Sequence, residues 1–319
     1  MEEKISIVIP CYRSEKMIAS VVEEIISYVN KWKYEIILIC DCSPDNVWSE
    51  IKKLQAKHAA VHGILFSKNF GQHAATLAGY RHSTGDIIVT MDDDGQSDPS
   101  AISRMIDKLH EGYDVVYAKY PSFEKTPFRV FGSWLNSKMA EILTEKPVGI
   151  QGNSFYVMRR YVKDEMIRYT NSFPYLGGLV FRVTGNIAEV DVEHRGRKEG
   201  TSNYTIGKLV KLWVNGFTAF SVLPLRIASL LGITFSCIGF ILGLVFVIRK
   251  LLNPEIIIGF TSIIVIVLFM GGVILLSVGL IGEYVGRIYI SQNQAPQYVI
   301  KEKTWKENIE ENSDGATNN

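Results

Sequence analysis

Asp86-Ile-Ile-Val-Thr-Met-Asp-Asp-Asp-Gly-Gln96 is a short apolar run that ends in three consecutive carboxylates and a turn. Carboxylates packed this closely repel one another unless a cation neutralises them. In an extended segment side chains alternate between two faces, so Asp92 and Asp94 share one face and Asp93 lies on the other. Gln96 follows as a third oxygen donor. Two carboxylates and an amide oxygen suit a hard cation such as Mg2+ or Mn2+. The alternative is an acidic turn that is merely solvated, and its position in the chain decides between the two.

Length and composition allow one sizeable core and a further segment. The chain has 319 residues, 47% of them hydrophobic, and a formal net charge of +1. That charge gives no indication of nucleic-acid binding. Met1–Lys4 is acidic and the apolar run after it breaks at Pro10, so no signal peptide is expected. The four cysteines lack metal-ligand spacing and are interpreted as reduced thiols in the cytosol: Cys11, Cys40, Cys42 and Cys237.

From Ile5 to about Ala118 the sequence alternates β-rich runs with helical patterns. Between the first two runs, Ser14 is expected to cap a helix whose apolar residues recur at helical spacing. Strand, helix and strand with short connections predict an α/β fold with a mostly parallel sheet covered on both faces. Ligands bind such sheets beyond the carboxyl ends of the strands. The expected strands are 5–9, 34–40, 61–67, 86–91 and 113–118.

The loops after these strands carry groups suited to a nucleotide. Tyr12 offers a ring that can stack on a base, and Asp41 and Asp45 can accept hydrogen bonds from a base or a ribose. Neither G-x-G-x-x-G nor G-x-x-x-x-G-K-[ST] occurs, which argues against a dinucleotide oxidoreductase or a P-loop ATPase. Each loop alone is a commonplace turn, so their order along the chain carries the inference.

Four motifs in order resemble a known enzyme family. They are Ser6-Ile-Val-Ile-Pro-Cys-Tyr12, Asp41-Cys-Ser-Pro-Asp45, Asn69-Phe-Gly-Gln72 and Gly85-Asp-Ile-Ile-Val-Thr-Met-Asp-Asp-Asp-Gly-Gln96. At this spacing they resemble the GT-A fold glycosyltransferases of family 2. More closely, the chain from Ile5 to about Tyr298 is similar to the polyprenyl-phosphate glycosyltransferases. That group contains dolichyl-phosphate mannose synthase and the bacterial undecaprenyl-phosphate sugar transferases.

The resemblance implies a site for a nucleotide sugar, linked to UDP or GDP. In it Asp92, Asp94 and Gln96 hold a divalent cation, Mg2+ or Mn2+, on the donor diphosphate, and Asp94 is a catalytic residue. Cys40 and Cys42 depart from the family pattern, so the base and the sugar stay open. The residues implied at the nucleotide sugar are Pro10, Tyr12, Glu15, Asp41, Asp92 and Asp93.

The segment 128–142 is interpreted as acceptor-binding. Arg129, Ser133 and Asn136 form a polar stripe beside an apolar one at helical spacing. On the pattern alone this is an amphipathic helix with a solvated face. The resemblance favours function, because this pattern matches the family's phosphate-binding helix, in which Arg129 and Ser133 hold the lipid phosphate. Lys119, where the family usually has an arginine, is assigned to the same site. The resemblance also places Arg197 over the diphosphate, so Arg129 and Arg197 are expected to be catalytic.

The C-terminal part of the sequence is expected to bind a membrane. A domain at 1–204 is followed by residues 205–226, whose pattern predicts a helix that is basic on one side and aromatic on the other. Residues 227–248 and 256–282 are uncharged, and each exceeds the roughly 20 residues that span a bilayer. The pattern therefore predicts a transmembrane hairpin over 227–283.

Charges around this hairpin predict its orientation in the inner (plasma) membrane. Basic residues at its outer ends outnumber Arg249 and Lys250 in the connecting loop, which places both termini and the catalytic domain in the cytoplasm. Glycines on both spans could pack helices within one chain or in a homo-oligomer. The tail 284–319 is expected to be cytoplasmic and disordered from Lys301 onward.

These features predict a metal-dependent, inverting transfer of a single sugar to a polyprenyl phosphate, undecaprenyl phosphate in a bacterium, for use in the cell envelope. Two alternatives remain. A processive polysaccharide synthase shares the fold and the acidic turn, but its relatives carry more spans and a Gln-x-x-Arg-Trp motif, and no tryptophan here directly follows an arginine. A non-catalytic membrane anchor or scaffold would have no reason to keep the acidic turn together with the Arg129 stripe.

Overall fold

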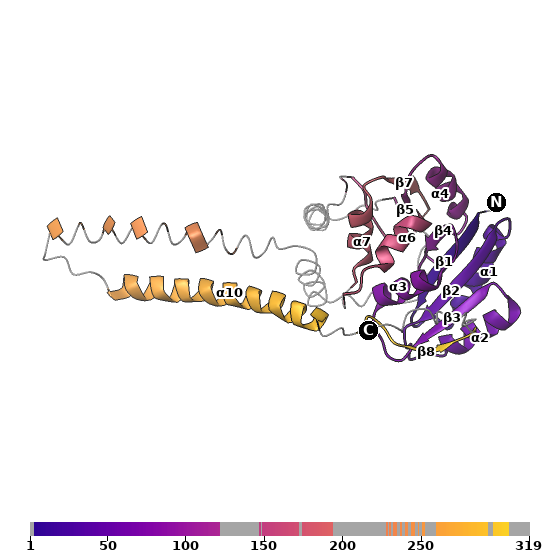
Figure 1. Cartoon of the computed structure of the whole chain (residues 1–319), viewed down its shortest axis with the longest axis horizontal. Helices are drawn as coiled ribbons and strands as arrows, with labels where there is room; N and C mark the ends of the chain where they lie inside the picture. Colours follow the sequence, from indigo (N-terminus) through magenta and orange to yellow (C-terminus); the bar gives the residue numbers. More distant parts are fainter. Residues whose placement is uncertain are drawn as a thin grey trace, which may run out of the picture. The chain divides into compact units, whose positions relative to one another are not determined.

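The computed structural model describes residues 3–121, 147, 149–171, 174–193, 260–292 and 296–305, with single residues and short stretches between 228 and 252. The chain divides into two compact units, labelled by element in Figure 1. Unit 1 comprises Met1–Ser202 and Pro296–Asn319, and unit 2 comprises Asn203–Ala295. Unit 1 thus contains residues 296–319 in addition to the N-terminal part of the chain, whereas the predicted catalytic domain ends at residue 204.

Unit 1 alternates strands and helices, and all five predicted strands are present close to their expected bounds. Its strands are β1 (Lys4–Cys11), β2 (Lys33–Cys40), β3 (Val61–Phe66), β4 (Ile87–Thr90), β5 (Val115–Lys119), β6 (Tyr156–Arg159), β7 (Ile187–Asp191) and β8 (Ile300–Lys303). Its helices are α1 (Ile18–Val29), α2 (Val47–Lys57), α3 (Gln72–His82), α4 (Ala101–His110), α6 (Arg160–Ile167) and α7 (Leu176–Val183).

The strands form one eight-stranded sheet in the order β7-β5-β6-β4-β1-β2-β3-β8. The pairs β1–β2, β2–β3, β1–β4 and β5–β7 are parallel, whereas β4–β6, β5–β6 and β3–β8 are antiparallel. The predicted α/β fold is confirmed, and its sheet is mixed, with the parallel strands β4, β1, β2 and β3 side by side. The carboxyl ends of β1 to β4 consequently lie along one edge of the sheet.

Helices pack on both faces of this sheet (Figure 1). Ile5 and Ile7 of β1 join a core cluster with buried residues of α1, α2 and α4. Val8, the next residue after Ile7, points to the opposite face of the strand and lies against α3. A Cβ at Gly79 of α3 would overlap the Val8 side chain and crowd Ile39. Gly79 therefore allows α3 to approach the sheet closely, a contact that its neighbours Ala74 and Ala75 also favour by their size.

The start of α1 differs from the prediction. The helix begins at Ile18, and no side chain of the described residues caps it. Ser14 contributes its backbone carbonyl instead, which accepts the N–H groups of Met17 and Ile18, each at 2.9 Å. Ser14 is only 2% exposed, so the packing of its loop rather than the helix end sets the surroundings of its hydroxyl.

The C-terminal segment also differs from the prediction, since Lys301–Trp305 is ordered on the sheet. Residues 300–303 form β8, which pairs antiparallel with β3. Beyond β8, Thr304 N–H donates to the Gly63 carbonyl at 3.0 Å, and its hydroxyl accepts the Gly63 N–H at 2.8 Å. The prediction of disorder from Lys301 was wrong for these residues, because pairing with a strand more than 200 residues earlier leaves no mark in local composition.

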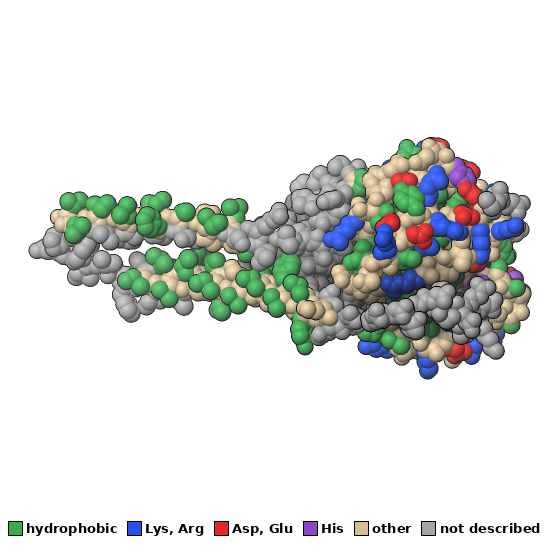
Figure 2. Space-filling view, viewed as in Figure 1, with side chains coloured by type: hydrophobic (Ala, Val, Ile, Leu, Met, Phe, Trp, Pro, Cys, Tyr) green, Lys and Arg blue, Asp and Glu red, His purple; other side chains and the backbone are tan. Residues whose placement is uncertain are grey.

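Unit 2 contains α10 (Phe260–Gln292), which covers most of the predicted second span and continues past residue 282. Among the described residues it is the one helix long and apolar enough to cross a membrane, with a mean hydropathy of 1.7 over Phe269–Gly286 and none of that window buried. Figure 2 shows hydrophobic side chains along it. Between 228 and 252 the described residues are helical, and most of them, such as Leu230 and Phe240, are exposed. Since half of the first span and most of the connecting loop fall outside the described residues, the two-helix hairpin stays a prediction.

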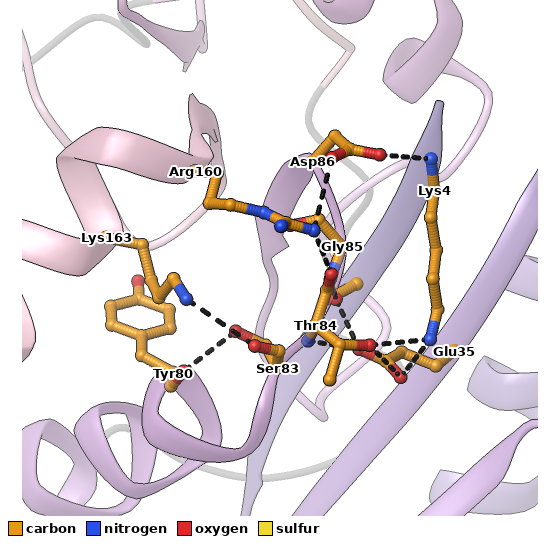
Figure 3. A network of polar contacts seen from close by, with 10 residues as sticks. Lys4, Glu35, Tyr80, Ser83, Thr84, Gly85, Asp86, Arg160 and Lys163 are labelled. Atoms are coloured by element: carbon orange, nitrogen blue, oxygen red, sulfur yellow. Dashed lines mark hydrogen bonds and ion pairs between the residues drawn. The ribbon is translucent and has the colours of Figure 1, made fainter. Parts of the chain in front are cut away.

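A polar network closes the amino end of the sheet, opposite the acidic turn (Figure 3). Glu35 at its centre is 6% exposed. Its carboxylate accepts hydrogen bonds from Lys4 Nζ at 2.6 Å, Ser6 Oγ at 2.5 Å and Thr84 N–H at 2.7 Å. Ser6 Oγ in turn accepts the Gly85 N–H at 2.7 Å. Burial by itself raises the pKa of Glu35, but these hydrogen bonds outweigh it and leave that pKa below 4.5.

Glu35→Gln should lower the free energy of unfolding by about 2 kcal/mol near neutral pH, because an amide leaves buried donors without a charged acceptor. A carboxylate whose pKa is lowered by folding stabilises the protein above its unfolded pKa, and that stabilisation is lost as the pH falls through the folded value. The difference between wild type and variant should therefore shrink in acid, below the ordinary value of 4.5.

Thermal unfolding of the detergent-solubilised protein, followed by near-UV circular dichroism across this pH range, measures the difference. The control is Glu50→Gln, since the Glu50 pair with Lys53 is exposed on the lysine side and should contribute less than about 0.5 kcal/mol. An equal loss of stability in both variants would contradict the assignment.

Candidate active site

Four loops meet at the carboxyl edge of the sheet, as the sequence predicts. They follow β1, β2, β3 and β4, which run parallel and in register, with Cys11 beside Cys40 and Val8 beside Thr90. A fifth segment, 149–155, joins them because β6 runs antiparallel to β4 and begins with Tyr156 beside Thr90. The acidic turn thus lies among loops from five places in the sequence.

Asp92 is held from two sides. Its Oδ1 accepts a hydrogen bond from Gln72 Nε2 at 2.7 Å, and its Oδ2 accepts one from the Ser154 hydroxyl. Gln72 is the first residue of α3, and Ser154 lies two residues before β6. Two elements that lie apart in the sequence therefore fix the orientation of this carboxylate.

The other two carboxylates of the turn have separate partners. Asp93 Oδ2 accepts the Tyr12 N–H at 2.8 Å, which ties the turn to the loop after β1. Asp94 Oδ1 accepts the Gln96 N–H at 3.1 Å, a local bond within the turn. Gly95 between them has a φ of 69°, which favours glycine at this position. The turn is thus held both by the loop after β1 and by a bond within itself.

Burial disfavours negative charge on this turn. It raises the pKa of Asp92, and the charge of Asp94 raises it further. Burial also raises the pKa of Asp93 to about 6, and the charges of Asp92 and Asp94 add to the shift. Because these carboxylates are already largely removed from water, binding a cation costs them little further hydration. The positive charge of the cation would restore their charged form. The electrostatics of the turn therefore fit a divalent ion.

The chemistry of the donor set fits the same ion. Asp92, Asp94 and Gln96 offer carboxylate and amide oxygens, the ligands that Mg2+ and Mn2+ prefer. In the part of the chain that the structure describes, no group of three or more His, Cys, Asp or Glu side chains is gathered for a metal. A cation held by two aspartates would accordingly need further oxygens from an amide, a bound diphosphate or water.

Asp41 links the loops after β2 and β3. It is 3% exposed, and its two carboxylate oxygens accept the N–H groups of Phe70 at 2.7 Å and Gly71 at 2.8 Å. Burial raises the pKa of Asp41, and the two N–H groups oppose that shift. Gly71 has a φ of 92°, a conformation that favours glycine. Asp41 thus shapes the third loop, while a carboxylate oxygen can still accept a further donor.

The other residues predicted to bind the nucleotide sugar differ in their exposure and contacts. Tyr12 is 44% exposed, so its ring is available to a ligand. Pro10 is buried within β1. Glu15 accepts the Asn46 N–H at 3.0 Å, and its own N–H donates to Asp45 at 2.9 Å, so the loops after β1 and β2 hold each other. Glu15 therefore joins two loops, and a direct contact with a nucleoside stays a prediction for both Pro10 and Glu15.

Only one predicted acceptor residue lies within the described residues. Lys119 is the last residue of β5 and is exposed. Arg129, Ser133 and Arg197 lie outside the described residues. Their roles rest on the sequence.

Three side chains at the site escaped the sequence analysis. Gln72 ends one of the four motifs and Ser154 lies in none of them, and their contacts with Asp92 span 20 and 62 residues of sequence. Tyr120 also lies close to the turn, since its hydroxyl is 3.5 Å from the Ser97 hydroxyl. Burial raises the pKa of Tyr120, and the charges of Asp92 and Asp94 raise it further. A tyrosine directly after a strand gives no sequence signal for this proximity.

Comparison with known proteins identifies relatives of this chain. It is 34% identical over 306 residues to an uncharacterized glycosyltransferase, YkcC, of Bacillus subtilis (strain 168), over 95% of each chain. It is 31% identical over 319 residues to the undecaprenyl-phosphate 4-deoxy-4-formamido-L-arabinose transferase of Yersinia pestis (strain Pestoides F), over 98% of this chain and 97% of the relative.

Solved structures share the fold. Glucosyl-3-phosphoglycerate synthase from Mycobacterium tuberculosis, in complex with Mn2+, UDP and phosphoglyceric acid, aligns with a TM-score of 0.51 at 18% identity, over 68% of this chain and 76% of that one. This likeness confirms the GT-A-like α/β sheet. The family described as Glycosyl transferase family 2 matches residues 6–166, which contain β1 to β6 and the whole acidic turn. With that match and near-full-length relatives above 30% identity, the chain belongs to glycosyltransferase family 2.

Proposed function

We propose that this glycosyltransferase moves a single sugar from a nucleotide diphosphate sugar to a polyprenyl phosphate, with undecaprenyl phosphate as the acceptor in a bacterium. The observation that carries the proposal is the acidic turn, where Tyr12, Gln72 and Ser154 fix the partly buried carboxylates of Asp92 and Asp93 beside an exposed aromatic ring. The near-full-length relatives named as undecaprenyl-phosphate sugar transferases support the acceptor.

In this reaction the protein supplies placement and charge. Asp92 and Asp94, with Gln96, would hold the divalent cation, which when bound offsets the charge of the departing diphosphate. Asp92 can hold its ligand orientation because Gln72 and Ser154 already fix its two oxygens. Arg197 is assigned to the same diphosphate. These groups lower the barrier at the leaving-group side.

The acceptor needs no general base. A polyprenyl phosphate is already anionic near neutral pH, so the attacking oxygen carries its charge before it reaches the sugar. Arg129 and Ser133, with Lys119 at the end of β5, are assigned to hold that phosphate. A single in-line attack inverts the anomeric configuration. The product is one sugar joined to one prenol through a phosphodiester.

Membrane attachment fits a lipid acceptor. The described side chains of α10 in the Phe269–Gly286 window are not buried within the protein, and a helix of this length and composition suits a bilayer. We assign α10 and residues 227–248 to a transmembrane hairpin, residues 205–226 to the interface, and both termini to the cytoplasm. The donor site would then face the compartment that holds nucleotide sugars.

The decisive experiment supplies membranes that contain the protein with undecaprenyl phosphate and a panel of labelled UDP- and GDP-linked sugars, and extracts the lipid-linked label. One sugar on a mild-acid-labile glycolipid is the expected product. A long polymer would favour a processive synthase, and transfer from no nucleotide sugar would favour a non-catalytic anchor.

The proposed topology predicts which face of the membrane each loop occupies. In a background with Cys42 and Cys237, the exposed cysteines, replaced by serine, a cysteine at position 253 should react with an impermeant thiol reagent in intact cells. A cysteine at position 312 should react only after the cells are opened. The opposite pattern would place the catalytic unit outside, away from its donor.

A further inference from the structure

A short segment that follows α10 in the sequence lies on the sheet of unit 1. We define the C-terminal strap as Pro296–Trp305, which belongs to unit 1 although only residues 293–295 separate it from α10 in the sequence. It lies outside residues 6–166, the part of the chain that the family model matches. Its β8 strand covers the β3 edge of the sheet, and Ser67 N–H donates to the Val299 carbonyl at 2.9 Å. The strap therefore reaches the start of the loop that follows β3.

Gln297 anchors the strap with every polar group of its side chain. It is 8% exposed. Its Oε1 accepts a hydrogen bond from Arg81 at 2.7 Å, and its Nε2 donates to the carbonyls of Tyr169 at 3.1 Å and Asn171 at 2.6 Å. A buried amide with all its groups bonded fixes one register, because a shifted strap would leave those groups unpaired. The strap is thus held at a defined position.

Tyr298 connects this anchor to the loop after β3. Its ring stacks on Phe66, with centroids 5.1 Å apart and planes 6° from parallel, and the Arg81 guanidinium lies 5.4 Å from the Tyr298 centroid. Phe66 meets Phe70 edge to face at 5.7 Å. Phe70 N–H donates to Asp41, the buried carboxylate of the donor site. A continuous path of packed rings therefore runs from the strap to Asp41.

We propose that the C-terminal strap is part of the donor site: Tyr298, through Phe66 and Phe70, holds the loop 67–71 in the conformation that positions Asp41 for the nucleotide. Tyr298 and Gln297 act in this as positioning residues, since neither bonds to Asp41 itself. The proposal rests on the proposed function in taking a nucleotide sugar as the ligand. It adds that the segment after the membrane helix, beyond the family match, sets donor affinity.

Trp305 provides a matched control on the same strap. Its ring packs against His62 and His82, with centroids 5.1 and 5.9 Å away, at the end of β3 remote from the loop 67–71. Trp305→Ala therefore removes an aromatic side chain from the strap without touching the path to Asp41. Tyr298→Phe is the conservative control, because it keeps the stacked ring.

The test compares full-length wild type, Tyr298→Ala, Tyr298→Phe and Trp305→Ala in detergent. Tyr298→Ala should raise the KM for the donor by about three- to tenfold, the range expected from one aromatic pair, with kcat nearly unchanged at saturating donor. Tyr298→Phe should match wild type, and Trp305→Ala should lower the unfolding temperature without changing the KM. Should Tyr298→Ala fail to fold, Tyr298→Leu removes the stacking while keeping apolar volume.

Hydrogen exchange of the peptide that contains residues 67–71 tests the same proposal without relying on turnover. It should be faster in Tyr298→Ala than in wild type and unchanged in Trp305→Ala. Unchanged exchange in Tyr298→Ala, or an equal rise in KM for both alanine variants, would overturn the role of the strap. If wild type uses no nucleotide sugar, the proposed function fails, and the exchange comparison still decides whether the strap holds this loop.

Discussion

Asp94→Asn should reduce sugar transfer by about a thousandfold, the loss expected when several kcal/mol of charge stabilisation in the transition state disappear. An amide keeps the size of the carboxylate but cannot neutralise a divalent cation on the donor diphosphate. For the same reason, EDTA should abolish the activity of wild type, and added Mg2+ or Mn2+ should restore it. Initial rates of lipid-linked label at a fixed donor concentration measure both effects.

The control for this substitution is Asp107→Asn, which makes the same chemical change at an exposed position of α4. It should leave the rate unchanged within about a factor of two, as expected for a surface substitution. The unfolding temperatures of the two variants should agree with wild type, so that the loss in Asp94→Asn is one of chemistry. Full activity of the double variant Asp92→Asn/Asp94→Asn in chelator would rule out the metal site.

Arg129→Ala should raise the KM for the lipid phosphate by about a hundredfold, because one guanidinium makes charge-assisted hydrogen bonds of about 1.5 to 3 kcal/mol each to a phosphate. Donor and metal binding should not change, since the acidic turn keeps its bonds to Tyr12, Gln72 and Ser154. Transfer rates at subsaturating lipid, together with equilibrium binding of the nucleotide, separate the two effects.

Arg168→Ala is the matched control, because the Arg168 side chain is 75% exposed and pairs with Glu165 one helical turn away. It should transfer sugar at the wild-type rate. If Arg129→Ala also does so at subsaturating lipid, the acceptor phosphate binds elsewhere, and Lys119 or Lys208 becomes the next candidate.

The sequence by itself determined the local structure of the catalytic unit. Short β-rich runs and the helical spacing from Ile18 to Val29 depend on neighbours within a few residues, so the strands and α1 could be predicted. The strand–helix–strand order predicted that the strands run parallel. It therefore also predicted the edge of the sheet at which Asp41 and the acidic turn meet. Apolar stretches without charge likewise marked α10.

Only the tertiary structure showed which long-range contacts hold these strands, helices and loops together. The hydroxyl of Ser154 reaches Asp92 across 62 residues, and Thr304 bonds to Gly63 across 241. A polar strap such as Lys301–Trp305 has the composition of a disordered tail, and its order comes from an open strand edge that the sequence around it does not encode. Ser14 failed as a helix cap for a related reason, since the packing of its buried loop overrode a local preference. Local sequence patterns reflect interactions between neighbouring residues. The long-range contacts stabilise the fold only after distant segments have been brought together.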